Sequence, residues 1–289
     1  MKNLVKLGLA ALLSTGSILL NAQRKNTENS TLWEISGNEL TKPSYIAGTA
    51  HIMCSKDFEI KTKVMKALEK SEQFVMEINY TEPTEIAAMQ KMYQTDKKLS
   101  EQLSPEEANE LDKILADYGT DLKKMDHSSS QGLYALISMK ALPCPQTEIK
   151  LYEIELLQNA LKNKKKVSGL EKVEDQMTSI NKAYDLKAVI GQLKMGKEYE
   201  ILLKEMVEAF KKEDVQSLYT LFKNDKIMNA KQEKAMLTDR NKNWAEKMPE
   251  IMKKESAFFA VGGAHLMGEN GVIQLLRSKG YTVKPVSSL

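Results

Sequence analysis

Two of the three histidines in this chain stand in the same short pattern, in which a glycine precedes the histidine by three residues. Gly48 and His51 belong to SYIAGTAH, and Gly262 and His265 belong to FFAVGGAH. In both stretches the pattern ends an apolar run that is typical of a buried strand. Because glycine has no Cβ, backbone or substrate can approach closely beside each histidine. The repeated pattern therefore marks a candidate site.

Two carboxylates fall at the ends of other apolar runs. Glu77 lies in FVMEIN and Glu171 ends KVSGLE. Two neutral imidazoles with two carboxylates suit a divalent transition metal. A carboxylate buried without a partner is costly, so Glu77 needs a cation or hydrogen-bond donors, and a structural ion pair is the alternative. Glu171 can instead cap a helix that begins near Lys172.

A further polar group lies in DRNKNWAEKMPEI, which has helical spacing. Arg240 and Trp244 are four residues apart and share one face of that helix, with Asn241 beside them. An arginine directed inward can bind a substrate carboxylate or stabilise an oxyanion. The alternative is that Arg240 is the partner of a buried glutamate. The third histidine, His127 in KMDHSSSQG, is expected at the surface.

These residues require a scaffold that brings several strand ends together. The apolar patterns predict strands at residues 31–36, 44–51, 74–79, 166–171, 257–265 and 281–286, and helices at 60–73, 104–119, 148–166, 270–280 and through most of 175–254. A strand, a helix and a strand over residues 44–79 form a βαβ unit, which implies parallel pairing. If the strands ending at the four candidate residues are parallel neighbours, their side chains emerge at one edge, where open α/β sheets bind ligands.

The order of elements indicates an α/β fold with a mixed, largely parallel sheet and a large helical insertion at about residues 83–163 and 172–254. The two histidine stretches align at Gly48 with Gly262 and at His51 with His265. This weak similarity suggests that the sheet arose from two related halves. Each half would then deliver one histidine to a shared site.

The first residues predict a secretory signal peptide, residues 1–22. Lys2 and Lys6 precede the apolar run LGLAALLSTGSILL, and Ala22 suits a cleavage point. An uncleaved N-terminal membrane anchor is the alternative. Cleavage leaves one domain, residues 23–289, expected to be exported to the periplasm or secreted, without a membrane span. It lowers the formal net charge from +3 by two, to +1, which favours neither nucleic acid nor an acidic membrane as partner.

Cys54 and Cys144 are the two cysteines of the chain. In an oxidising compartment they can form a disulfide that closes a long loop, and the rigid turn LPCPQ around Cys144 suits that role. Two unrelated thiols are the alternative. No CxxC or Cys/His zinc pattern is present in the sequence.

Together, the stretches SYIAGTAH, FVMEIN, GLEKVEDQM, DRNKNW and VGGAHLMGENGVIQLLRSKGYTVKPV resemble the TraB/PrgY/GumN family, in order and over nearly all of residues 23–289. That family includes the animal TIKI proteins, described as metal-dependent peptidases, and belongs to a wider erythromycin-esterase-like group. The resemblance implies a metal-dependent hydrolase. In it, His51, Glu77 and His265 match invariant positions, and Glu171 and Arg240 match weaker ones.

What the resemblance implies for the site can be stated by residue. His51, His265 and Glu77 are expected to hold a divalent ion, Mn²⁺ or Co²⁺ by analogy, with Zn²⁺ as a further option. Glu77 or Glu171 is expected to act as general base.

Arg240, with Asn241, is expected to contact the substrate or a developing oxyanion. Peptidase activity on exported peptides or proteins is the function expected first. Ester or lactone hydrolysis at the same site is one alternative, and non-catalytic binding of an exported peptide or metal is another. The sequence does not specify the substrate or the oligomeric state.

Overall fold

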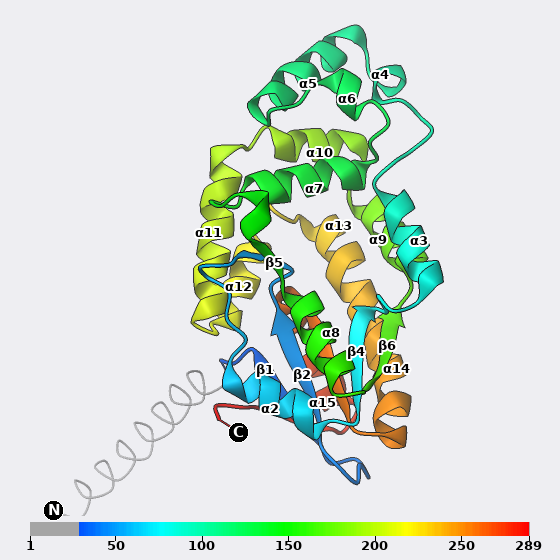
Figure 1. Ribbon diagram of the computed structural model, residues 1–289, viewed down its shortest axis with the longest axis vertical. Helices are drawn as coiled ribbons and strands as arrows, with labels where there is room; N and C mark the ends of the chain where they lie inside the picture. Colours follow the sequence, from blue (N-terminus) through cyan, green and yellow to red (C-terminus); the bar gives the residue numbers. More distant parts are fainter. Residues whose placement is uncertain (1–28, 289) are drawn as a thin grey trace, which may run out of the picture.

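A six-stranded sheet with helices on both faces forms the body of the protein in a computed structural model, which describes residues 29–288 (Figure 1). The predicted signal peptide lies outside the described residues. The order of strands across the sheet is β6-β4-β7-β2-β1-β8. Their bounds are β1 Leu32–Ser36, β2 Ser44–Thr49, β4 Gln73–Ile78, β6 Lys166–Glu171, β7 Ala257–Gly262 and β8 Thr282–Pro285.

The four strands that precede the candidate residues are parallel neighbours. β4 pairs in parallel with both β6 and β7, and β7 pairs in parallel with β2. β1 runs antiparallel to β2 and to β8 at the other side of the sheet. The prediction of a mixed, largely parallel α/β sheet is confirmed. The carboxyl ends of β2, β4, β6 and β7 consequently meet at one edge.

β2 and β7, the strands of the two histidine stretches, lie side by side at the centre of the sheet. Thr49 is opposite Gly262, and Gly48 is opposite Val261, so the two glycines of the repeated pattern are offset by one residue in register. Both strands are buried along their whole length. Their continuous apolar sequences follow from this, because a strand covered on both faces needs no polar side. An origin from two related halves stays a prediction.

The core lies on both faces of the sheet. Along β7, Phe258 belongs to the larger apolar cluster and Phe259 to the second one, because successive side chains of a strand point to opposite faces. The first cluster includes side chains of α2 (Thr62–Lys70) and α8 (Tyr152–Lys162). The second includes side chains of α14 (Asp239–Lys254) and α15 (Val272–Ser278).

Helices fill most of the chain between β4 and β6 and between β6 and β7, and they extend beyond the carboxyl edge of the sheet (Figure 1). α5 begins with a capping box, in which Ser104 Oγ accepts from the backbone N–H of Glu107. None of the helices within residues 29–288 has both the length and the apolar character needed to cross a membrane. The bounds of the helices in these two segments are α3 Pro83–Met92, α4 Leu99–Gln102, α5 Pro105–Asp117, α6 Leu122–Met125, α7 Ser130–Lys140, α9 Val173–Ala183, α10 Leu186–Leu193, α11 Lys197–Lys211, α12 Val215–Phe222 and α13 Ala230–Glu233.

A second sheet of two short strands lies beyond the end of β2, and the sequence does not predict it. β3 (Ile52–Cys54) pairs antiparallel with β5 (Ile149–Leu151). The strand expected to end at His51 therefore ends at Thr49, and the helix expected from residue 148 begins only at Tyr152. Strands of three residues are too short to show a period, so the pattern could not separate them from their neighbours.

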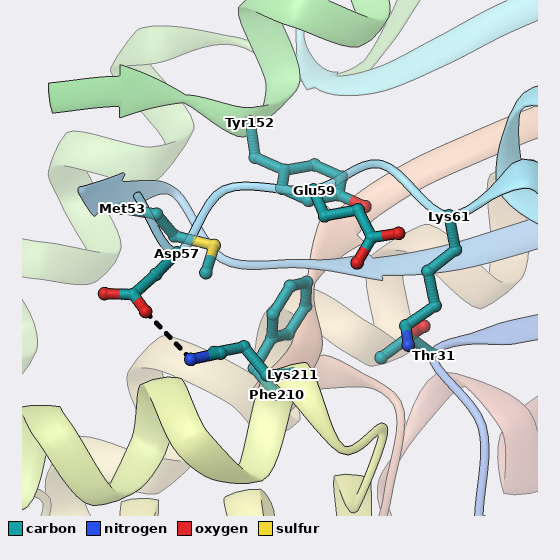
Figure 2. A pocket seen from close by; sticks show the side chains of 8 residues that line it. All are labelled: Thr31, Met53, Asp57, Glu59, Lys61, Tyr152, Phe210 and Lys211. Carbon is teal, nitrogen blue, oxygen red and sulfur yellow. Dashed lines mark hydrogen bonds and ion pairs between the residues drawn. The ribbon is translucent and has the colours of Figure 1, made fainter. Parts of the chain in front are cut away.

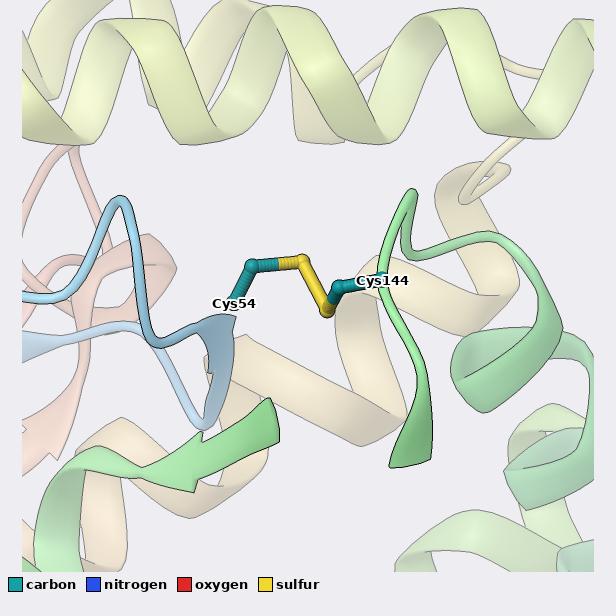
Figure 3. The surroundings of a disulfide bond; sticks show 2 residues. All are labelled: Cys54 and Cys144. Atoms are coloured by element: carbon teal, nitrogen blue, oxygen red, sulfur yellow. A yellow bond between two sulfur atoms is a disulfide. The ribbon is translucent and has the colours of Figure 1, made fainter. Parts of the chain in front are cut away.

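The two cysteines are joined, which decides between the two alternatives left by the sequence. Cys54 at the end of β3 and Cys144 form a disulfide with a Cα–Cα distance of 5.9 Å (Figure 3). The bond fastens the segment leading into β5 to the strand that follows His51. The second sheet and the disulfide thus hold a segment from far along the chain against the end of β2.

Candidate active site at the carboxyl edge of the sheet

Four of the predicted side chains meet in one buried cluster at the carboxyl edge. Glu77 comes from the end of β4, Glu171 from the end of β6, and His265 from η3 (Gly263–His265), the turn after β7. Arg240 reaches them from the second residue of α14. All four side chains are at most 7% exposed. The parallel arrangement of strands expected from the sequence brings Glu77, Glu171 and His265 to one edge, and the packing of α14 adds Arg240.

Arg240 is the centre of this cluster. Its Nη2 donates to Glu77 Oε2 at 2.6 Å and to Glu171 Oε1 at 2.7 Å, and its Nε donates to Glu171 Oε1 at 3.1 Å. Its Nη1 donates to the carbonyl of Met236 at 3.0 Å and to Nε2 of His265 at 3.2 Å. The structure therefore gives Arg240 the role that the sequence left as the alternative, the partner of buried glutamates. Planar guanidinium geometry suits this forked contact.

The two carboxylates of the cluster differ in their surroundings. Burial opposes the ionisation of Glu77, but Arg240 and the backbone N–H of Gly262, at 2.8 Å from Oε1, hold its pKa at about 2. Burial raises the pKa of Glu171 and outweighs the nearby Arg240. Trp244 Nε1 also donates to Glu171 Oε2 at 3.1 Å. Of the two carboxyl groups, Glu171 therefore takes a proton more readily. The alternative role for Glu171, as the N-cap of α9, is not found, because the N-cap residue is Lys172.

His265 is held as a neutral ring with a defined tautomer. Arg240 can only donate, so Nε2 of His265 accepts, and Nδ1–H donates to Asn241 Oδ1 at 2.6 Å. Asn241 is itself oriented, because its Nδ2 donates to the carbonyl of Asn270 at 2.8 Å. Burial and the charge of Arg240 lower the pKa of His265 to about 3. The ring also packs against Trp244, with centroids 4.4 Å apart.

His51 lies outside this cluster and contacts Glu153, a residue that the sequence pattern does not single out. Its Nδ1 is 2.6 Å from Oε1 of the buried Glu153, which also accepts from Thr49 Oγ1 at 2.5 Å. Because a carboxylate only accepts, Nδ1 carries the proton. Glu153 raises the pKa of His51 to about 9, although the His51 side chain is 63% exposed. Within YEIELLQ, Glu153 looks like an ordinary residue of a helix surface, and no sequence signal distinguishes it.

The ring of His51 faces the buried cluster across Gly262. A Cβ placed on Gly262 would lie 3.1 Å from Nε2 of His51 and 3.4 Å from Oε1 of Glu77. On the other side, Oε1 of Glu77 is 4.0 Å from Nε2 of His265. The bare backbone of Gly262 thus keeps open the space beside which both histidines and Glu77 lie.

These donors fit a divalent ion in their chemistry. Both rings carry a proton on Nδ1, where a protein acceptor holds it, so Nε2 is the atom of each ring that can bind an ion. Because the pKa of His51 is about 9, its ring also carries a proton on Nε2 at neutral pH, and a bound ion would have to displace that proton. The carboxylates of Glu77 and Glu171 lie against the guanidinium of Arg240, and the buried carboxylate of Glu153 lies against His51. Together these four groups have a formal charge of −2 when both imidazoles are neutral. A divalent cation would balance that charge.

One contact opposes an ion at this place. Nε2 of His265 already accepts from Arg240, so an ion bound by His265 would have to replace that hydrogen bond. Among residues 29–288, no group of three or more His, Cys, Asp or Glu side chains is spaced as a metal centre. The metal stays a prediction that the donor types support.

A cavity of about 150 Å³ is lined in part by Met53 and Tyr152, which are close in the sequence to His51 and Glu153 (Figure 2). Met53, Tyr152 and Phe210 form its apolar lining, and Asp57 and Lys211 form an ion pair of 2.8 Å at its border. The cavity contains none of the polar residues of the buried cluster, so it is distinct from the candidate site.

Comparison with known proteins agrees with the resemblance seen in the motifs. The model of the TraB/PrgY/gumN family matches residues 31–285. Metalloprotease TIKI1 of Danio rerio is 22% identical, in an alignment that covers 89% of this chain and 63% of that protein. The chain thus spans less than two thirds of the length of this relative. No solved structure matches the chain.

Proposed function

The chain belongs to the TraB/PrgY/gumN family, and on that premise we propose that it is a metal-dependent hydrolase that acts at the carboxyl edge of its sheet. Exported peptides or proteins are the proposed substrates. The observation that carries the proposal is the convergence of His51, Glu77 and His265 on the space beside Gly262. The similarity to a protein named as a metalloprotease supports the choice of peptide bonds.

His51, Glu77 and His265 would hold the ion. When bound, a divalent ion supplies Lewis acidity toward a carbonyl group and lowers the pKa of water. Glu153 and Asn241 keep the two Nδ1 protons in place, so both rings can present Nε2.

Glu171 is the proposed proton acceptor and donor. Its raised pKa brings it closer to neutral pH than Glu77, whose pKa is about 2. Arg240 lies against both carboxylates and orients them. Because its N–H groups are directed to Glu77, Glu171, Met236 and His265, contact with a substrate would require one of these bonds to be exchanged.

The test is a loading experiment on the protein from Gln23 onward. It is incubated with Mn²⁺ or Co²⁺, desalted and assayed for bound metal by mass spectrometry, beside His51→Ala, His265→Ala and Glu77→Gln. His127→Ala is the matched control, because His127 is exposed and outside the cluster. The proposal expects about one ion in the wild type and the control and a loss in the three variants. Equal retention by all five proteins would overturn the metal site.

The substrate class is tested with the metal-loaded protein. A peptide library and a panel of small esters and lactones are incubated with it, and products are identified by mass spectrometry. Cleaved peptides that disappear when a chelator is added support a peptidase. Cleavage of esters alone would assign the site to ester hydrolysis. Stoichiometric loss of peptide without product would indicate a binding protein instead of an enzyme.

A further inference from the structure

Glu153 is a buried carboxylate whose side-chain partners come from one short segment. It lies in the first turn of α8 and is 7% exposed. Thr49 Oγ1 donates to its Oε1 at 2.5 Å, and His51 Nδ1 lies 2.6 Å from the same atom. Burying a carboxylate is costly unless hydrogen-bond donors satisfy it, and for Glu153 the side chains of Thr49 and His51 supply those donors. Burial would raise the pKa of Glu153, but the adjacent His51 outweighs it and lowers the pKa.

The second sheet places Glu153 under His51. The backbone N–H of Tyr152 donates to the carbonyl of His51 at 3.3 Å, so consecutive residues of the β5–α8 junction hold both the backbone and the ring of His51. β3 continues from His51 and pairs with β5 residue by residue. The disulfide fastens the end of β3 to the chain that leads into β5. The contact is therefore built by the fold.

The two histidines are oriented by chemically different acceptors. His265 donates Nδ1–H to the neutral amide oxygen of Asn241, whereas His51 donates Nδ1–H to a charged carboxylate. A charged acceptor makes a stronger hydrogen bond and increases the electron density at the opposite ring nitrogen. Because the His51 ring is exposed, little else fixes its rotation. Glu153 is thus in the position to set both the tautomer and the aim of Nε2.

We propose that Glu153, assisted by Thr49, is the positioning residue of His51, holding Nδ1–H so that Nε2 faces the space between Gly262 and Glu77 where a divalent cation binds. This inference rests on the proposed metal-dependent function. It assigns a role to a residue that acts through His51 and does not itself touch the reacting atoms.

The test compares Glu153→Ala, Glu153→Gln and Thr49→Val with the wild type, in the protein from Gln23 onward. The matched control is Glu155→Gln, two residues along the same helix, whose carboxylate pairs with Lys150 at 2.9 Å. Co²⁺ affinity is measured by titration calorimetry and by the visible absorption of the bound ion. The imidazole N–H of His51 is followed by ¹H–¹⁵N NMR, with His51→Ala to assign it.

The expected Co²⁺ affinity falls by about 10- to 100-fold in Glu153→Ala and less in Glu153→Gln and Thr49→Val, because the amide oxygen of Gln can still accept from Nδ1–H. Glu155→Gln should bind Co²⁺ like the wild type. Glu153→Gln and Thr49→Val keep the size of the side chain, so they test the idea even if Glu153→Ala does not fold. Unchanged Co²⁺ affinity in all three variants would overturn the inference, even if the N–H signal is lost.

Failure of the proposed function gives a different result. If the wild type binds neither Co²⁺ nor Mn²⁺, the metal-dependent hydrolase is refuted, and the NMR signal then decides about Glu153. A slowly exchanging Nδ1–H of His51 that disappears in Glu153→Ala supports the positioning role. The same signal persisting in Glu153→Ala would overturn it.

Discussion

A Cβ placed on Gly262 would lie 3.1 Å from Nε2 of His51, so the end of one histidine stretch is directly against the ring of the other. The backbone at Gly262 has φ −53° and ψ 136°, which any residue can adopt. Glycine is therefore required here because the ring of His51 lies so close, and not because of the backbone conformation.

Gly262→Ala should consequently fold and lose function. The new methyl group would occupy the space beside His51 and Glu77, while the exposed ring of His51 can move aside. We expect the melting temperature to stay within a few degrees of the wild type. Metal affinity and hydrolysis should each fall by about tenfold or more, an effect of the size seen when ligand positioning is disturbed. Calorimetric metal titration and differential scanning calorimetry measure the two quantities.

The control for this substitution is Gly191→Ala in α10, where an added Cβ meets nothing within 4 Å. It should leave metal binding unchanged and stabilise the helix by about 0.5–1 kcal/mol, since alanine is the better helix former. Wild-type metal affinity in Gly262→Ala would mean that His51 and Glu77 do not share a ligand.

Gly48 has a packing role, which predicts a loss of stability. A Cβ on Gly48 would lie 2.7 Å from Cδ1 of Leu266 and 3.1 Å from Cα of Gly263. Leu266 is fully buried, so it cannot move into solvent. Gly48→Ala should lower the free energy of unfolding by about 1–3 kcal/mol, the usual cost of overpacking. Urea denaturation at equilibrium measures it.

Leu266→Val in the same background tests the cause of that loss. Valine has no Cδ atoms, so the contact of the new Cβ with Cδ1 of Leu266 is removed and part of the stability should be recovered. The two substitutions should therefore be non-additive. Strict additivity of the two changes would show that Gly48 is needed for another reason.

The sheet was predictable because its central strands are covered on both faces and are long enough to appear in the sequence as apolar runs. SYIAGTAH and FFAVGGAH are continuous apolar runs. The βαβ order over residues 44–79 implied that SYIAGTAH and FVMEIN run parallel; they do, but β7 lies between them and pairs with both. The cluster of Glu77, Glu171 and His265 followed from that order, since parallel strands end at the same edge. What the sequence could not give is which partner each carboxylate takes. Pairing with Arg240 depends on where α14 packs.

The second sheet and the burial of Glu153 could not be predicted, because both depend on contacts between distant parts of the chain. β3 and β5 are three residues long, and each is a strand only because it pairs with the other. Their partners are far apart in the sequence, so the local hydrophobic pattern does not predict the pairing. Glu153 follows β5 by two residues and becomes buried only because this pairing turns α8 toward His51. A glutamate in the first turn of a helix is already explained by the helix dipole, so nothing in the pattern around Glu153 distinguishes it.

The disulfide should contribute to the stability of the whole chain. Cys54 and Cys144 are separated by 90 residues, and the chain-entropy argument for a loop of that size gives an upper value of about 4–5 kcal/mol. Cys54→Ala combined with Cys144→Ala should lower the free energy of unfolding by a large part of this amount. Guanidinium denaturation measures it, with alkylation and mass spectrometry to verify the bond in the wild type.

Reduction of the wild type supplies the comparison. It should reproduce the stability of the double variant, because both remove the same cross-link. If the reduced and oxidised proteins unfold at the same denaturant concentration, the disulfide does not stabilise the protein by lowering the conformational entropy of the unfolded chain.

Arg240 should be the most costly side chain of the cluster to remove. Arg240→Met leaves Glu77 and Glu171 buried without their cation, and breaking a buried ion pair in this way costs about 3–5 kcal/mol. Adding Glu171→Gln removes one of the stranded charges, so the double variant should be more stable than Arg240→Met alone. Lys253→Met on the same helix is the control: Lys253 is exposed, and its replacement should change stability by about 0.5 kcal/mol or less. Chemical denaturation of the wild type, Arg240→Met, Glu171→Gln and the double variant completes the cycle and gives the coupling energy. A coupling near zero would show that Arg240 holds its position for reasons other than the charge of Glu171.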